Sequence, residues 1–170
     1  TEELKPFLNP EFETLDTISN PFGTGKVDHS ARLDVNGFFK GISTYLEKHD
    51  LLVNEKLNYA EINDSTYKDF TFKNMVFCEG MGVTSNPYFT DIQVIANKGH
   101  HLKVKLAKTI SPQYTIKKKH FLFPLNEELY YYGGTYDPNE RANEIDDFKT
   151  EELKEGLAAF YSHDFEVVEV

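Results

Sequence analysis

The segment HFLFPLNEELYYYGG, residues 120–134, decides the fold. Two apolar, aromatic runs, HFLFP and ELYYYGG, flank the polar turn LNEE, and this order is typical of a β-hairpin. Upstream, HLKVKLA at residues 101–107 alternates as a strand does. Leu102, Val104 and Leu106 face one way, and His101, Lys103 and Lys105 face the other. These segments predict neighbouring strands of a largely antiparallel sheet.

Helices and further strands are expected on either side of this hairpin. Asp34 is a good N-cap for a helix whose apolar residues recur at helical spacing from Val35 to Leu46. A second helix is expected to begin at Thr150 as its N-cap, with an apolar stripe of Leu153, Leu157 and Phe160. Further strands are predicted at residues 51–57, 67–72, 74–78, 91–97 and 165–170. The order of elements predicts an α+β fold, a mostly antiparallel sheet flanked by helices.

Composition narrows the class of protein. The chain has 170 residues, for which one domain is the default, and its 18 basic against 28 acidic residues give a net charge of −10. That balance argues against binding to nucleic acid or to an anionic membrane surface. No apolar run approaches the roughly 18 residues of a membrane span. The single cysteine, Cys78, excludes an internal disulfide and favours a reducing, cytoplasmic location.

Two glycine-rich stretches resemble nucleotide-binding loops but lack essential parts. GTGK, residues 23–26, lacks the earlier glycine and the Ser or Thr after the lysine, so we expect a turn there. GMGVTS, residues 80–85, has two glycines of a dinucleotide fingerprint after an apolar run that reads as a buried strand ending at Cys78. Pro87 then prevents the helix that the motif must open. Neither stretch is expected to be a primary dinucleotide loop.

Histidines and tyrosines are the other candidates for a site. KGHH, residues 98–101, and His120 are not expected to bind a metal, because adjacent residues of a strand point to opposite faces. Tyr130 and Tyr132 share one face of their strand and Tyr131 takes the other, so one set is expected in the core or in contact with a partner, and the other can line a ligand site. Gly133 and Gly134 would let another group approach the backbone closely.

Several segments in order resemble one enzyme family. VFCEGMG (76–82), KGHHLKVKL (98–106), FLFPLNEELYYYGGTYDP (121–138) and KTEELKEGLAAF (149–160) resemble segments of FAD-dependent oxidoreductases of the D-amino-acid oxidase, glycine oxidase and sarcosine oxidase type. Upstream, residues 25–55 resemble the helix and strand that precede them there. The resemblance covers residues 25–170 and implies the middle, substrate-domain portion of a longer chain, without the family's N-terminal G-x-G-x-x-G loop and C-terminal flavin segment.

The resemblance carries expectations about cofactor and domains. The parent enzyme would use FAD to oxidise an amine or amino acid, while residues 1–170 alone would be inactive and would not hold FAD tightly. Glu79 and Gly80 would lie where the backbone passes the FAD nucleotide. Within the domain, residues 1–32 would be an irregular lead-in, residues 33–80 would adjoin the flavin domain of the same chain, and residues 81–170 would form the substrate-domain sheet and helix.

Substrate contacts are expected from side chains of the sheet and one loop. The candidates are His101, His120, Tyr130, Tyr132 and Arg141. A bidentate arginine holds a carboxylate best, and only Arg32 and Arg141 exist here, so the clamp is Arg141, lies outside this sequence, or is not needed. The alternative function is a non-enzymatic α+β module that binds a ligand or protein. Exposed strands, such as the last one, would favour pairing with a second copy.

Overall fold

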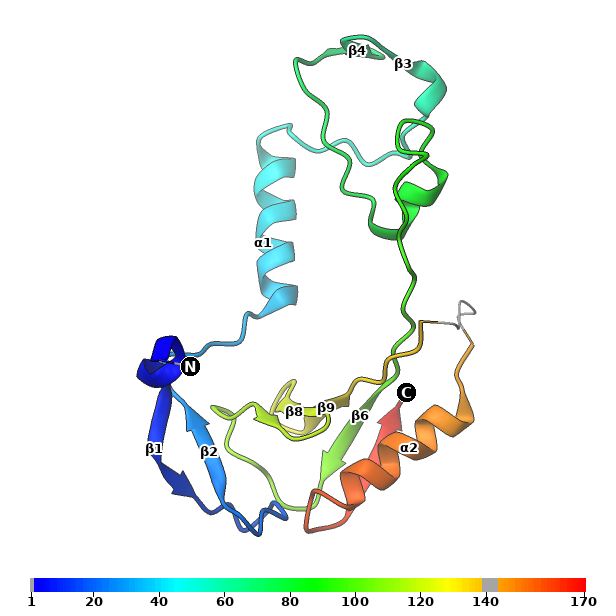
Figure 1. The fold of residues 1–170 in the computed structure, drawn as a ribbon. Coiled ribbons are helices and arrows are strands. Elements are labelled where there is room, and N and C mark those ends of the chain that lie inside the picture. Colours follow the sequence, from blue (N-terminus) through cyan, green and yellow to red (C-terminus); the bar gives the residue numbers. More distant parts are fainter. Residues whose placement is uncertain (1, 139–143) are drawn as a thin grey trace. The chain divides into compact units, whose positions relative to one another are not determined.

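The computed structural model describes residues 2–138 and 144–170 of the chain. It divides into two compact units (Figure 1). The larger, called here the sheet unit, comprises Thr1–Arg32 and Asn97–Val170, and the smaller comprises Leu33–Ala96. Whether they make one domain over residues 1–170, as the sequence predicts, stays a prediction.

The sheet unit is built on a five-stranded antiparallel sheet in the order β10-β6-β9-β8-β7. The predicted hairpin is confirmed, since β8 pairs with β9 and places Leu122 opposite Tyr132. The next strand along, β6, sets Leu102 opposite the same tyrosine. The C-terminal strand is the outer edge beside β6. The bounds are β6 His101–Leu106, β7 Ile116–Lys117, β8 Phe121–Pro124, β9 Leu129–Gly133 and β10 Phe165–Glu169.

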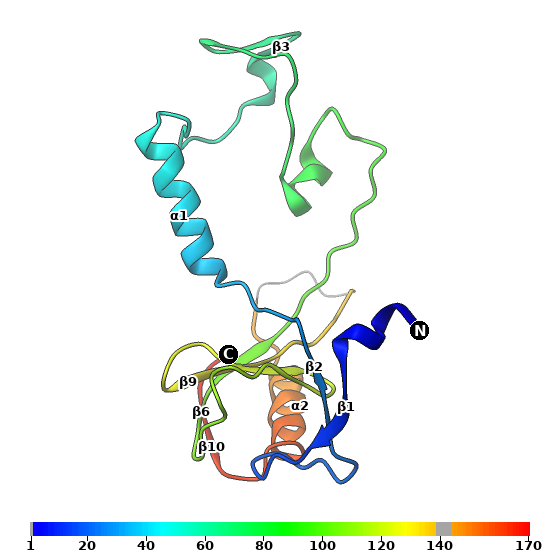
Figure 2. The same cartoon turned by 90° about the vertical axis from the view of Figure 1, so that its left-hand side faces the viewer.

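Helix α2, Asp147–Ala158, covers one face of this sheet and contacts β6 and β9. Figure 2 shows it, in orange, against the strands. The predicted apolar stripe is confirmed, because Leu153, Leu157 and Phe160 are all buried. They meet the buried side of the strands, where Leu102, Val104 and Leu122 are at most 1% exposed. Each fully buried aliphatic side chain contributes about 1.5–3 kcal/mol, so this contact is the core of the unit.

The start of α2 differs from the prediction. The N-cap is Asp146, whose side chain accepts hydrogen bonds from the backbone N–H groups of Phe148 and Lys149. Thr150, expected as the cap, is a buried residue in the second turn, and its hydroxyl donates to the Asp146 carbonyl at 2.9 Å. Both residue types are good caps, and a hydrogen bond from the Asp146 N–H to His100 Nε2 fixes the chain at Asp146.

The lead-in over residues 1–32 is more ordered than expected. After the 3-10 helix η1, Glu2–Phe7, strands β1, Leu8–Glu13, and β2, Thr24–Val27, pair antiparallel. The predicted turn at residues 23–26 was therefore wrong, because most of it is strand β2. Ile18, in the connection, is buried in the core and forms a bridge with Tyr161, which attaches the hairpin to the sheet unit.

The smaller unit contains helix α1, Val35–Lys48, and a three-stranded antiparallel sheet in the order β3-β4-β5. The prediction for α1 is confirmed, including Asp34 as the N-cap, whose side chain accepts from the Gly37 N–H. The other elements are η2 Tyr59–Glu61, β3 Ile62–Asn63, β4 Thr66–Tyr67, β5 Phe70–Thr71 and η3 Gly80–Ser85.

Several predicted strands of this unit were wrong. In the described part of the chain, residues 51–57, 74–78 and 91–97 are not in strands, and residues 67–72 turn back at Lys68 and Asp69 to make β4 and β5. Cys78, expected to be buried at the end of a strand, is exposed. An apolar run becomes a strand only where another strand offers backbone partners, and local pattern does not report on that.

The architecture is therefore α+β, with antiparallel sheets and helices, as the sequence predicted. Within the described residues, every helix is too short or too polar to cross a lipid bilayer.

Candidate functional site

The face of the five-stranded sheet opposite α2, called here the open face, carries a different set of side chains. Strand alternation sends His101, Lys103 and Lys105 to it, while their neighbours pack under the helix. Phe123 and Tyr131, which are cross-strand partners, lie on the same face and are half-buried. A half-covered aromatic surface beside charged groups is the most distinctive surface of the unit.

Four planar groups are stacked in a row across this face. The Arg32 guanidinium lies 4.5 Å from the centroid of the Phe123 ring. The Phe123 and Tyr131 rings are 4.6 Å apart and 12° from parallel, and the Tyr131 and His101 rings are 4.9 Å apart and 21° from parallel. Cation–π and stacking contacts of this kind hold the side chains in fixed positions across the strands. We call Arg32, Phe123, Tyr131 and His101 the stacked row.

The absence of a side chain at Gly133 allows strand β9 to pack closely beside His101 of β6. Gly133 is the cross-strand partner of His101. A Cβ at Gly133 would lie 2.6 Å from the His101 Cβ and 2.9 Å from its Cα, which is closer than such atoms approach. The close approach predicted at Gly133 and Gly134 is therefore made by the chain's own His100–His101 segment.

Charged side chains next to the row are paired with one another. Lys103 Nζ lies 2.8 Å from Glu169 Oε2, across the β6–β10 pairing. Lys105 Nζ lies 3.8 Å from Glu128 Oε2. Arg32 has no carboxylate within ion-pair distance among residues 2–138 and 144–170, so its charge is available to a ligand.

The predicted substrate-side residues that the structure describes do not converge on one site. His101 is on the open face, whereas Tyr130 and Tyr132 are on the covered face, 3% and 2% exposed. The Tyr130 hydroxyl donates to the Ile110 carbonyl and accepts from its N–H, a structural role. Burial raises the pKa of Tyr132 to about 12, so this phenol stays neutral under ordinary conditions.

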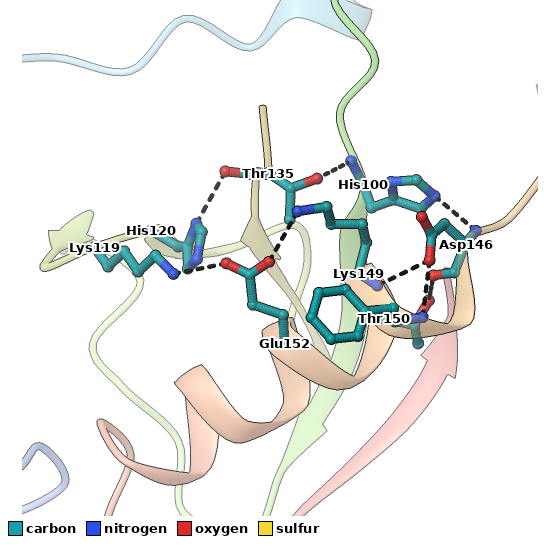
Figure 3. Close-up of polar contacts among 10 residues, drawn as sticks. His100, Lys119, His120, Thr135, Asp146, Lys149, Thr150 and Glu152 are labelled. Carbon is teal, nitrogen blue, oxygen red and sulfur yellow. Dashed lines mark hydrogen bonds and ion pairs between the residues drawn. The ribbon is translucent and has the colours of Figure 1, made fainter. Parts of the chain in front are cut away.

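His120 also lies on the covered side, in a polar network around the first turns of α2 (Figure 3). Its Nδ1 lies 2.9 Å from the Gly134 carbonyl oxygen and therefore carries the proton. His100 is placed similarly, with Nε2 accepting from the Asp146 N–H at 3.0 Å. Both histidines are more than 90% buried, and their second ring nitrogens have no hydrogen-bond partner in the described part of the chain. These rings support the start of α2.

A surface ion triplet completes the network shown in Figure 3. Lys119 and Lys149 lie 2.7 and 3.2 Å from the two carboxylate oxygens of Glu152. The hydrogen bond from Lys119, followed by that from Lys149, lowers the pKa of Glu152. The triplet connects the segment before β8 to α2.

Glu79 and Gly80, predicted to lie at the cofactor, form a local structure in the smaller unit. The Glu79 carboxylate accepts from the Tyr59 hydroxyl and, at 2.7 Å, from Asn86 Nδ2. The hydrogen bond to Glu79 raises the pKa of Tyr59. Gly80 has φ of 53°, which favours glycine, and its Cα side is open. The Glu79 carboxylate, which follows an apolar run, thus links Tyr59 to the buried Asn86 through hydrogen bonds.

Sequence reasoning missed part of the stacked row. Arg141 lies outside the described residues, and Arg32, which does contact the sheet, comes from an irregular segment without a local signal. Alternation separated Tyr131 from Tyr130 and Tyr132, and the register with β6, in which Tyr131 pairs with Lys103, places Tyr131 on the open face. No cluster of three metal-binding side chains occurs among the described residues.

Comparison with known proteins does not assign this chain to a family or to a known structure. No model of a known protein family matches the chain, and no solved structure matches it significantly.

Proposed function

We propose that the sheet unit is the substrate-binding part of an FAD-dependent oxidoreductase that oxidises an amine or amino acid. The proposal starts from the ordered segments that resemble the D-amino-acid oxidase, glycine oxidase and sarcosine oxidase family. The observation that carries it is the two-sided character of the sheet. Helix α2 covers one face, and the other presents the stacked row to its surroundings.

The open face offers ring edges to a ligand. Neighbouring rings lie within 21° of parallel and cover one another's faces, so an aromatic ligand would pack against their edges, an arrangement that aromatic pairs favour, without rearranging the strands. FAD, when bound, supplies the acceptor for the hydride. This chain would position the substrate through Tyr131 and His101 and would exclude water from the face that the ring covers.

Of the two residues of the smaller unit that were predicted to contact the cofactor, only one is suited to that role. Open space beside Gly80 allows close approach to the backbone. Both oxygens of Glu79 already accept hydrogen bonds from Tyr59 and Asn86, so Glu79 shapes the turn rather than presenting an unoccupied carboxylate. Gly80 is therefore the better candidate for a cofactor contact.

A binding module without catalytic activity is the second candidate. The same observation favours it, because a half-exposed aromatic row with one unpaired arginine also resembles the anchor residues of protein interfaces. The two candidates differ in what the natural polypeptide carries when it is purified.

The test is to purify the natural polypeptide that includes this sequence and to analyse it for flavin and for oxidation of amines and amino acids. We expect a yellow protein that releases FAD and oxidises one of these substrates. The 170-residue chain, prepared in parallel, is expected to be colourless and inactive. A natural polypeptide without flavin would overturn the proposal and favour the binding module.

A further inference from the structure

A groove beside the β8–β9 hairpin is the feature of the sheet unit that the proposed function leaves unused. Its volume is about 480 Å³. The turn after β8 and the loop after β6 form its sides, with Pro112, Pro124 and Leu125 as apolar walls. A concave apolar surface with a few polar groups is typical of a site for a small molecule.

Arg32 supplies the groove with its cation. The guanidinium carbon lies 4.5 Å from the centroid of the Phe123 ring, and the guanidinium N–H groups have no hydrogen-bond partner in the described part of the chain. No carboxylate of the described residues lies within ion-pair distance of it, whereas Lys103 and Lys105 on the same sheet are paired with glutamates. A guanidinium fixed by an aromatic ring and lacking an acid is prepared for a bidentate oxyanion.

Two polar side chains of the groove can donate hydrogen bonds to a ligand. The Asn126 Oδ1 accepts from the N–H groups of Glu128 and Leu129, at 2.9 Å each, which leaves its Nδ2 to donate. The Ser111 oxygen accepts from the Gln113 N–H, so its hydroxyl hydrogen can turn to a ligand. Glu127, also in the lining, adds one negative charge and opposes a doubly charged anion.

We propose that this groove binds a small monocarboxylate with an apolar body. The carboxylate pairs with Arg32 and accepts from Asn126 or Ser111, and the body lies on Pro112, Pro124 and Leu125. The site belongs to this chain and needs no flavin. It shares Arg32 with the stacked row, but binding of a carboxylate to the chain without flavin is measured separately from oxidase activity.

The experiment is a titration of the isotope-labelled 170-residue chain with hexanoate, followed by amide chemical shifts. Hexanol tests the apolar body alone, and inorganic phosphate tests the anion alone. We expect saturable shifts at residues 109–112 and 124–127 with hexanoate, and binding at least about fivefold weaker with either other probe. Equal affinity for hexanoate and phosphate, or for hexanoate and hexanol, would overturn the proposal.

Charge variants give the decisive comparison. Arg32→Gln should weaken hexanoate binding about tenfold, while Glu127→Gln should strengthen it, a result that a purely structural role does not produce. Lys117→Gln is the matched control, because Lys117 also lies over a ring, that of Phe121 at 4.0 Å, but outside the groove. Unchanged affinity in Arg32→Gln, with dispersed spectra showing that it is folded, would contradict the site.

Discussion

At the scale of single residues, Gly133 is the position where packing on the open face leaves least room. Gly133→Ala places a methyl group 2.6 Å from the His101 Cβ, so β6 and β9 must separate. We expect the free energy of unfolding to fall by about 1–3 kcal/mol, as for other overpacked sites. Urea denaturation followed by circular dichroism measures it.

The matched control for this variant is Gly25→Ala in β2, where the new Cβ would meet only the Phe12 ring, at 3.9 Å. Its effect should stay within about 0.5 kcal/mol. Equal destabilisation by both variants would show that glycine is not specifically required beside His101.

Because the Tyr132 phenol is buried, we expect the protein to lose stability at alkaline pH. An unfolded tyrosine ionises near pH 10, whereas burial raises the pKa of Tyr132 to about 12. Between these values the unfolded state binds fewer protons than the folded state, so stability falls as pH rises. Burial also raises the pKa values of Tyr131 and Tyr161, which will add to the fall.

The variant Tyr132→Phe isolates one contribution to that fall. The wild type should lose up to about 2–3 kcal/mol more than Tyr132→Phe between pH 10 and 12. Tyr136→Phe, at a residue that is 71% exposed, is the control and should follow the wild type. Parallel pH profiles for wild type and Tyr132→Phe would contradict the burial argument.

The three consecutive tyrosines also show what residue-level reasoning could and could not predict. Alternation alone separated Tyr131 from Tyr130 and Tyr132. Choosing the outward set required the register with β6, where Val104 pairs with Tyr130 and Lys103 with Tyr131. Arg32 could not have been found, because its position depends on a contact with Phe123, 91 residues later in the chain.

At the scale of elements, the N-cap of α2 predicts a measurable asymmetry between adjacent aspartates. Asp146 accepts hydrogen bonds from two backbone N–H groups, whereas Asp147 occupies the first turn and acts there only through its charge. Asp146→Ala should destabilise the protein by about 1 kcal/mol and Asp147→Ala by a few tenths. Thermal or urea denaturation distinguishes them, and equal or reversed effects would contradict Asp146 as the cap.

Elements whose signals are local in the sequence were predicted well. The β8–β9 hairpin, β6 and α1 carry their signals in local pattern, turn and cap. The β1–β2 pair was missed, because residues 14–23 separate the strands and Pro10 and Pro21 argue against regular structure. Apolar runs such as Leu51–Val53 were overpredicted, since they are exposed and lie outside the strands described.

At the scale of the whole molecule, the sheet unit has one packed face and one open face. Leucines of α2 and the strands complete the first, which explains why the unit needs no disulfide. The second retains the stacked row, whose planar groups do little for the core. We propose that this surface contacts another group, which the proposed function identifies as a flavin and its substrate.

The most direct test is the rate at which substrate bleaches the bound flavin of the natural polypeptide, measured by stopped-flow absorbance. Tyr131→Leu should keep its FAD content but bleach at least about tenfold more slowly, because the row no longer positions the substrate. Tyr136→Leu, at an exposed tyrosine outside the row, should match the wild type. Equal bleaching rates in all three proteins, or no flavin to bleach, would contradict the assignment of the open face.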